Sequence, residues 1–179
     1  DADRLLRSKL RKVITGVTYV TDKTHYHFLD DERRSLQEAL EAKLPGYEVA
    51  VAGLSKDETK ALVVTYSDKS QGTYYFHDRN TGVLTKLIAT SPWLVEEQMA
   101  DMKPVAYTSR DGMTIHGYLT LPRGVEPKNL PVVLNPHGGP WYRDRWGFNP
   151  EVQFLANRGY TVLQMNFRGS TGYGKAFWQ

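Results

Sequence analysis

Two short apolar runs separated by a helical pattern constrain the fold of this chain more than any other feature. The runs lie in "LPVVLNPHGGP", residues 130–140, and "TVLQMNF", residues 161–167. Between them, Val152, Leu155 and Ala156 form an apolar stripe at helical spacing, and Gly159 stands where a C-cap is expected. A buried strand, a helix and a second buried strand make a βαβ unit, so residues 130–167 are predicted to open an α/β sheet.

The first hundred residues have a different pattern, typical of antiparallel β structure. Short runs rich in β-branched and aromatic residues, bounded by turn residues, predict strands over 12–21, 47–54, 60–67 and 72–78. The sequence "NTG", residues 80–82, signals a turn after the last of these strands, and a further strand follows it. Ala61 to Leu87 is therefore predicted as a three-strand meander. Such a meander could be part of one propeller blade, and a blade needs neighbours to bury its faces.

One helical pattern interrupts these strands. Asp30 or Asp31 is the predicted N-cap of "ERRSLQEALEAKL", in which leucines recur every fourth residue, and Pro45-Gly46 ends the pattern. The spacing predicts a surface helix with one apolar stripe and no chemistry of its own.

Residues 91–104 are predicted to be the boundary between two domains. Prolines flank a short helical stretch there, and the pattern changes afterwards. "PVAYTSRDGMTIHGYLTLP" then predicts a hairpin with Asp111-Gly112 at its turn. We therefore expect one domain over residues 1–100 and a second over residues 101–179.

The composition narrows the classes of function. The net charge is +3, from 23 basic and 20 acidic residues that are interspersed. Basic residues cluster in one segment, Arg4 to Lys12, which is predicted to be a solvated face or a connector rather than a nucleic-acid site. Without cysteine, disulfide and thiolate chemistry are excluded, and no apolar run approaches the ~20 residues that span a membrane. We expect no nucleic-acid or membrane partner, and the compartment, cytoplasmic or periplasmic, stays open.

"NFRGSTGYGKAF", residues 166–177, is a glycine-rich loop that nearly matches two known motifs. Gly169, Gly174 and Lys175 fit a phosphate-binding loop, but Ala176 stands where a hydroxyl must hold Mg²⁺. A nucleophile elbow around Ser170 would need glycine in place of Arg168, and in α/β hydrolases the base follows the serine. All five histidines precede Ser170, so the loop is predicted to be a turn and not a nucleophile site.

The histidines outside this region indicate no metal or cofactor site. His25 and His27 are two residues apart on a strand-like segment and are predicted to be a surface pair. His77 and His116 stand alone on predicted strands, where we expect ordinary polar partners.

The segment His137-Gly138-Gly139-Pro140 follows the first strand of the βαβ unit. A turn at this edge exposes backbone N–H groups, and glycines let a substrate oxygen approach them without a Cβ in the way. Gly138 and Gly139 are therefore candidates for an oxyanion hole, with His137 in a structural role. A plain turn would have the same four residues.

Together these segments resemble one enzyme family. "HGGPW" followed by "FLANRGY" and "NFRGSTGYG" closely resembles the opening of the catalytic domain in the prolyl oligopeptidase family of serine peptidases. The acylaminoacyl-peptidase and dipeptidyl-peptidase branch is the most similar. "SRDGMTIHGYLTLP" resembles the hairpin that starts that domain, and "GTYYFHDRNTGVLTKL" resembles a terminal blade of the preceding propeller.

This resemblance implies a β-propeller followed by an α/β-hydrolase domain, of which the chain holds the end of the first and the N-terminal part of the second. It implies hydrolysis of short peptides, releasing residues or dipeptides from a terminus, without a cofactor. The Gly139 N–H would be one oxyanion donor, and the residue after the nucleophile would be the other. The dipeptidyl-peptidase IV relatives carry Tyr where His137 stands. The active-site loop would comprise His137, Pro140, Trp141, Arg168 and Tyr173.

The resemblance also places the nucleophile, the acid and the base beyond Gln179, so residues 1–179 are expected to be inactive alone. Two other functions remain open from the residues themselves, an esterase or other α/β hydrolase and a non-catalytic scaffold protein. A sheet cut after two central strands exposes an unpaired edge, so self-association is a further expectation beside a peptide substrate.

Overall fold

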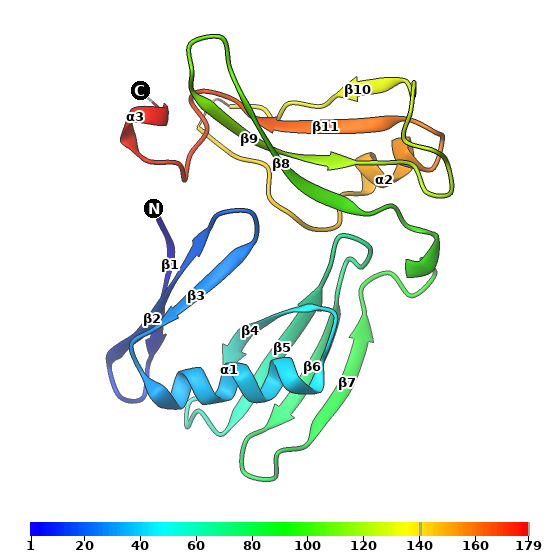
Figure 1. The fold of residues 1–179 in the computed structure, drawn as a ribbon. Coiled ribbons are helices and arrows are strands. Elements are labelled where there is room, and N and C mark those ends of the chain that lie inside the picture. Colours follow the sequence, from blue (N-terminus) through cyan, green and yellow to red (C-terminus); the bar gives the residue numbers. More distant parts are fainter. Residues whose placement is uncertain (140, 179) are drawn as a thin grey trace.

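The computed structural model describes residues 1–139 and 141–178, which form three sheets and a few short helices (Figure 1). Two antiparallel sheets have the orders β1-β2-β3 and β4-β5-β6-β7, and a mixed sheet has the order β10-β11-β9-β8. The strands are β1 (Ala2–Ser8), β2 (Val13–Val20), β3 (Thr24–Phe28), β4 (Glu48–Leu54), β5 (Lys60–Tyr66), β6 (Thr73–Asp78), β7 (Leu84–Ala89), β8 (Met102–Thr108), β9 (Thr114–Thr120), β10 (Val132–Leu134) and β11 (Thr161–Asn166).

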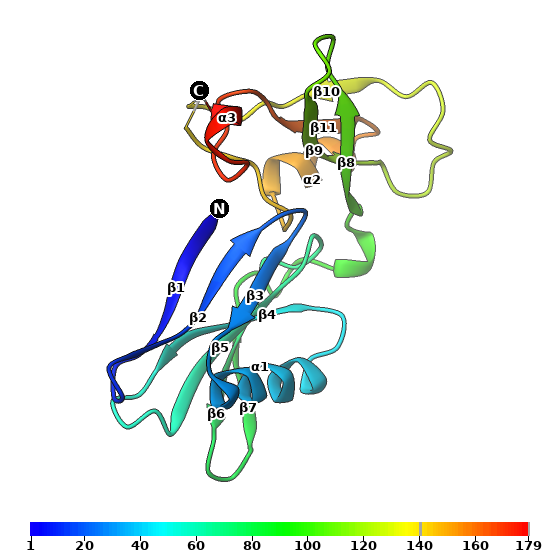
Figure 2. The same cartoon turned by 60° about the vertical axis from the view of Figure 1, so that its left-hand side comes forward.

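The helices are α1 (Asp31–Lys43), the 3-10 turn η1 (Glu96–Gln98), α2 (Pro150–Ala156) and α3 (Lys175–Trp178). No helix in the described part of the chain is long and apolar enough to cross a lipid bilayer. Figures 1 and 2 both show the mixed sheet above the two antiparallel sheets, with the start of the chain close to α3.

The antiparallel sheets contain the strands expected in the first hundred residues and one that was not expected. The meander over residues 61–87 is β5-β6-β7, and β4 completes its sheet. The basic segment Arg4 to Lys12, predicted to be a solvated face or a connector, is in large part the strand β1, which pairs with β2. The prediction missed this strand because arginines and leucines stand where β-branched residues usually mark one.

Helix α1 covers one face of the β4–β7 sheet (Figure 1). Leu36 and Leu40 pack against Val49, Ala61 and Val63 in an apolar core. The expected single apolar stripe is therefore confirmed, because the leucines spaced by four residues all turn toward the sheet.

Asp30 is the N-cap of α1. Its carboxylate accepts the backbone N–H of Arg33 at 2.9 Å and the Arg11 guanidinium at 2.7 Å. The Arg11 hydrogen bond, with help from the Arg33 N–H, lowers the pKa of Asp30 to about 2. Because the folded pKa is lowered, this carboxylate stabilises the fold above its unfolded pKa of about 4, and that contribution is lost as the pH falls through the folded pKa.

We expect Asp30→Ala to lower the free energy of unfolding by about 1 kcal/mol at neutral pH, because the backbone N–H of Arg33 in α1 and the Arg11 guanidinium lose their acceptor. The difference in the free energy of unfolding between Asp30→Ala and the unchanged protein should shrink as the pH falls below about 4. Urea titrations of the full-length protein at several pH values measure both effects. Glu38→Ala, on the exposed side of α1, is the control. An equal loss in the two variants at neutral pH would contradict a capping role.

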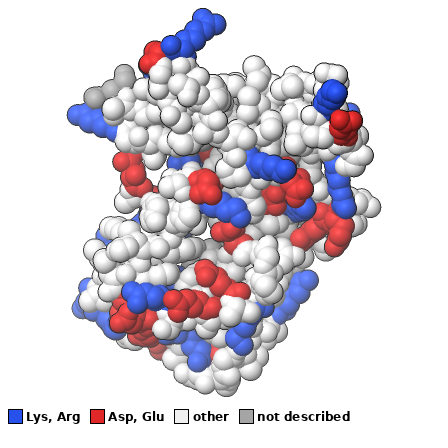
Figure 3. All heavy atoms as spheres, in the orientation of Figure 1, with Lys and Arg blue, Asp and Glu red and all other residues white. Residues whose placement is uncertain are grey.

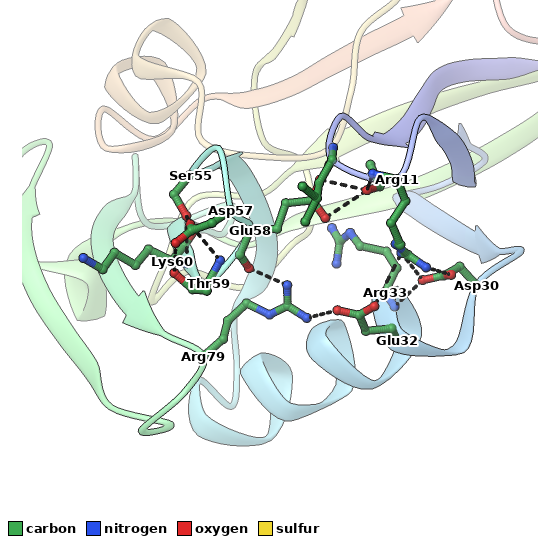
Figure 4. A network of polar contacts seen from close by, with 12 residues as sticks. Arg11, Asp30, Glu32, Arg33, Ser55, Asp57, Glu58, Thr59, Lys60 and Arg79 are labelled. Atoms are coloured by element: carbon green, nitrogen blue, oxygen red, sulfur yellow. Dashed lines mark hydrogen bonds and ion pairs between the residues drawn. The ribbon is translucent and has the colours of Figure 1, made fainter.

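A network of polar contacts joins α1 to the β1–β2 turn and to the β4–β5 turn (Figure 4). The buried Glu58 accepts the Ser8 hydroxyl at 2.9 Å. Arg79 donates to the Glu58 carbonyl and to the Glu32 carboxylate, each at 2.5 Å. Exposed ion pairs contribute little singly, so the Ser8–Glu58 bond, which satisfies a buried carboxylate, is the more important link between the two antiparallel sheets.

The mixed sheet confirms the predicted βαβ unit and hairpin. β10 and β11 pair in parallel with α2 between them, and β8 and β9 form the antiparallel hairpin. α2 buries Val152 against Tyr118 and Val162. β9 pairs with β11 at a close approach of the two backbones beside Gly117. A Cβ at Gly117 would lie 2.3 Å from the Gln164 carbonyl oxygen, so this pairing requires glycine.

The expectation that both strands of the βαβ unit are buried holds for β11 and is wrong for β10. Most of β11 is buried, whereas Val132 and Leu134 of β10 are 59% and 61% exposed. β10 lies at the edge of the sheet, with β11 as its one neighbour among the described residues. An apolar run therefore ends up at an exposed edge, which is a surface on which another strand can pair.

The mixed sheet contacts the antiparallel sheets through side chains of both parts. The Tyr118 hydroxyl donates to the Asp22 carbonyl at 2.8 Å, and the Lys23 ammonium lies 3.6 Å from the centre of the Trp146 ring. The Gln153 amide donates to the Asp68 carbonyl at 2.9 Å. These contacts join the mixed sheet and α2 to the turns of both antiparallel sheets.

Candidate active-site turn

The glycine turn expected to bind an oxyanion follows β10 at the carboxyl edge of the mixed sheet. His137, Gly138 and Gly139 lie in this turn, and Pro140 falls outside the described residues. Both glycines are exposed, and their backbone N–H groups have no acceptor within residues 1–139 and 141–178. Exposed amides of this kind can stabilise an oxygen that gains negative charge during a reaction.

Of the two glycines, Gly139 is the one that the turn requires. Its φ is +133°, and a Cβ there would lie 2.9 Å from the backbone nitrogen of Trp141. A Cβ at Gly138 would meet open space. The backbone at position 139 therefore adopts a conformation that side chains rarely allow, at the position whose N–H is the candidate oxyanion donor.

His137 is held by contacts at both ring nitrogens. Nδ1 lies 2.8 Å from the Gly138 carbonyl oxygen, and Nε2 lies 2.8 Å from Ser170 Oγ. The ring stacks on Phe167 with the centroids 4.4 Å apart, and Tyr142 meets it edge-on. The sequence contains no signal for the Ser170 contact, because the two residues are 33 positions apart and no local pattern links them.

Ser170 is fully buried, and its hydroxyl donates to the Phe167 carbonyl at 2.6 Å. A nucleophilic serine must present its oxygen to the substrate at an exposed turn. A buried hydroxyl that is bonded to a backbone carbonyl does not do so. The contact between His137 and Ser170 therefore joins the turn to the glycine-rich loop, and its geometry differs from that of an exposed nucleophile.

Several backbone amides of the glycine-rich loop have partners within the protein. Gly169 N–H donates to the Phe177 carbonyl and Thr171 N–H to the Tyr142 carbonyl, both at 3.0 Å. Gly174 N–H donates to the Asp1 carboxylate at 3.0 Å. A phosphate-binding loop needs such amides to face the phosphates. This loop uses them to join α3, the turn after β10 and the first residue of the chain.

Asp144 and Asn166 anchor the segment that follows the turn. The Asp144 N–H donates to Asn166 Oδ1 at 2.7 Å, and Asn166 Nδ2 donates back to the Asp144 carbonyl at 3.1 Å. The Asp144 carboxylate accepts the Gln164 amide at 2.9 Å. Burial raises the pKa of Asp144, and the proximity of His137 opposes that rise. β11 thereby fixes the far end of the turn with two side chains from one face of the strand.

Arg143 connects this segment to the first sheet. The residue is 3% exposed, and its guanidinium donates to the carbonyls of Val20 and Thr21 at 3.2 and 3.0 Å. It also donates to the Tyr173 hydroxyl at 2.7 Å and lies 4.3 Å from the centre of that ring. A Cβ at Gly172 would lie 2.7 Å from the guanidinium, so the glycine of the "STG" sequence makes room for Arg143.

The remaining residues expected in an active-site loop take different places. Trp141 is 70% exposed and follows the turn directly. Arg168 is exposed and binds the Asp111 carboxylate in the β8–β9 turn at 2.5 Å. Tyr173 is half-buried beneath the turn, where its hydroxyl meets Asn166 at 2.7 Å. The structure thus brings His137 and Trp141 to the turn and assigns Tyr173 to its support.

The other histidines lie apart from this turn or beside its support. His25 contacts the Asp22 carboxylate at 3.1 Å, and His77 meets the Val83 carbonyl at 3.1 Å. His116 stacks on Tyr173 with the centroids 5.2 Å apart. In the part of the chain that the structure describes, no three His, Cys, Asp or Glu residues are grouped to hold a metal ion.

Positive and negative side chains alternate over the face shown in Figure 3. Among the described residues, oppositely charged side chains form close pairs, such as Lys69 with Asp101 at 2.6 Å and Arg34 with Asp31 at 2.7 Å. Interspersed charges of both signs do not favour one polyanionic partner on this face.

The arrangement of the sheets is similar to that of solved peptidases. A puromycin-hydrolyzing peptidase of Mycobacterium tuberculosis matches with a TM-score of 0.65 and 23% identity, over 91% of this chain and 25% of its own. The acylaminoacyl peptidase of Pyrococcus horikoshii matches with a TM-score of 0.60 and 21% identity, over 91% and 25% of the two chains. At these identities the likeness shows the fold.

The amino-acid sequence is similar to one family of peptidases. Residues 146–179 match the model of the prolyl oligopeptidase family. Dipeptidyl aminopeptidase BIII of Pseudoxanthomonas mexicana is 41% identical over 169 residues, which cover 90% of this chain and 24% of the relative. Dipeptidyl peptidase family member 6 of Caenorhabditis elegans is 29% identical, over 92% of this chain and 25% of its own length. The chain is similar to members of the prolyl oligopeptidase family of peptidases and spans about a quarter of the length of these relatives.

Proposed function

We propose that the protein is a serine peptidase that hydrolyses short peptides and removes residues or dipeptides from a terminus. Residues 1–100 would be the end of a β-propeller, and residues 101–179 the beginning of an α/β-hydrolase domain. The similarity to a dipeptidyl aminopeptidase over nine-tenths of the chain supports the dipeptidyl type, and the named acylaminoacyl peptidase supports the alternative of an acylated substrate.

The observation that carries this proposal is the turn at Gly139. An acyl-transfer enzyme needs backbone donors aimed at the carbonyl oxygen that becomes an oxyanion. Gly139 is exposed, and its place after the carboxyl end of β10 supports a role of its N–H as such a donor. The residue after the nucleophile would be the second donor.

We propose that the nucleophile, the acid and the base belong to other parts of the parent protein, beyond Gln179. Ser170 is buried and bonded to a carbonyl, and His137 uses both ring nitrogens in the turn. The described residues therefore contribute the oxyanion donor and its support rather than the group that attacks the substrate.

The test compares the full-length protein with residues 1–179. We expect the full-length protein to release nitroaniline from dipeptidyl or acylaminoacyl nitroanilides and to react with a fluorophosphonate, and we expect residues 1–179 to do neither. Turnover by residues 1–179 that Ser170→Ala abolishes would overturn the assignment of the triad to other residues. Hydrolysis of nitrophenyl esters by the full-length protein without cleavage of any nitroanilide would favour an esterase. A full-length protein that reacts with neither substrate nor fluorophosphonate would favour a scaffold.

A further inference from the structure

We propose that His137 and Ser170 are positioning residues that set the direction of the Gly139 N–H. The proposal rests on the proposed role of that N–H as an oxyanion donor, and it adds how the donor is aimed. It follows from one hydrogen bond, between His137 Nδ1 and the Gly138 carbonyl oxygen at 2.8 Å.

The Gly138 carbonyl and the Gly139 N–H belong to the same peptide unit. A trans peptide is planar, so its C=O and N–H point in opposite directions. A hydrogen bond that fixes the carbonyl therefore fixes the direction of the N–H. Glycines on both sides of this unit would otherwise let it rotate readily, because neither has a Cβ to restrict it. His137 thus replaces the restraint that the glycine pair lacks.

The protons on the His137 ring follow from its partners. A carbonyl oxygen only accepts hydrogen bonds, so Nδ1 carries a proton when it binds Gly138. The Ser170 hydroxyl donates to the Phe167 carbonyl, which leaves its oxygen free to accept from Nε2. The imidazolium form satisfies all three contacts together. In the neutral form with the proton on Nδ1, the hydroxyl donates to either Nε2 or Phe167, and the bond to Gly138 persists.

The surroundings of the ring keep it in this orientation. Phe167 stacks on one face, and Ser170, which is fully buried, holds Nε2. The loop that carries Ser170 is itself bonded to the turn through Thr171 N–H and the Tyr142 carbonyl. Rotation of the Gly138–Gly139 peptide would therefore break the hydrogen bond to Nδ1, because the ring cannot follow the carbonyl without leaving Ser170.

Two substitutions of His137 separate its two contacts. The amide nitrogen of Asn takes the approximate place of Nδ1, and that of Gln takes the approximate place of Nε2. His137→Asn should keep the bond to Gly138, and His137→Gln should keep only the link to Ser170. In the full-length protein we expect His137→Gln to lower kcat about 10- to 100-fold with KM within about 3-fold, and His137→Asn to lower kcat less than about 5-fold.

Ser170→Ala is a milder variant, in which the ring keeps its stacking but loses the partner of Nε2. We expect it to lower kcat less than about 5-fold, as in His137→Asn, because the bond between Nδ1 and the Gly138 carbonyl remains. The control is His27→Gln, the same change at an exposed position on β3, which should leave kcat unchanged.

Binding of a peptide boronic acid and of the product dipeptide gives a readout that a merely structural role would not move. The boronate forms a tetrahedral adduct with an anionic oxygen, so its affinity should fall in parallel with kcat in His137→Gln, and dipeptide affinity should stay unchanged. Equal losses in His137→Asn and His137→Gln, a loss in KM or melting temperature alone, or unaltered boronate affinity would overturn the positioning role.

Crystal structures of the two His137 variants test the positioning without any activity. The Gly138 carbonyl should keep its direction in His137→Asn and turn away in His137→Gln. An unchanged direction in both would refute the inference even for an active peptidase. A changed carbonyl direction in His137→Gln alone would uphold the positioning role, even if the protein cleaved no peptide. In that case only the proposed function would fail.

Discussion

Gly139→Ala in the full-length protein is expected to lower kcat about 100-fold while KM changes less than about 3-fold. The added Cβ would lie 2.9 Å from the Trp141 backbone nitrogen, and the residue would have to keep a φ of +133°. The turn must therefore move, and the N–H of residue 139 moves with it. Because an oxyanion donor acts mainly in the transition state, the loss should appear in kcat rather than in substrate binding.

Steady-state kinetics with a dipeptidyl nitroanilide measure this effect. Gly53→Ala is the matched control, since a Cβ at Gly53 on β4 would meet open space and its backbone does not have a positive φ. An unchanged kcat in Gly139→Ala would remove the oxyanion role from this turn. If a fall in melting temperature accounts for the whole loss of activity, the oxyanion role of this turn would also be contradicted.

Arg143→Leu is expected to lower the free energy of unfolding by about 3 kcal/mol, because several buried partners lose their donor at once. The carbonyls of Val20 and Thr21 and the Tyr173 hydroxyl would be left without the guanidinium that now joins them. Since Arg143 also connects the first sheet to the glycine-rich loop, that loop should become more open to proteolysis than the rest of the protein.

Urea titration and limited proteolysis of the full-length protein test this prediction. Arg143→Lys should recover only part of the loss, because an ammonium lacks the planar fork that reaches several partners together. Arg110→Leu, at an exposed arginine in the β8–β9 turn, should change the free energy of unfolding by less than about 0.5 kcal/mol. Similar losses in Arg110→Leu and Arg143→Leu would refute the connecting role of Arg143.

Elements with a strong local signal could be predicted from the sequence. The N-cap at Asp30 or Asp31, the hairpin turn at Asp111-Gly112 and the stripe with Val152 are all local patterns. The structure confirms the elements that they mark and selects Asp30 as the N-cap. β1 was missed because its leucines and arginines form no recognisable alternation, and it becomes a strand through its pairing with β2. Exposure of β10 was also missed, because burial of an apolar run depends on which strands lie beside it.

Some features of the candidate site could likewise be predicted from local sequence, and others could not. The sequence by itself determined the turn at Gly138 and Gly139, the βαβ unit around it and the resemblance to one peptidase family, since residue type and spacing carry all three. Only the tertiary structure decided that His137 meets Ser170 and that Arg143 reaches the first sheet. These contacts join residues 33 and 123 positions apart. Such pairs leave no periodic trace in the sequence, because folding alone brings them within the reach of a hydrogen bond.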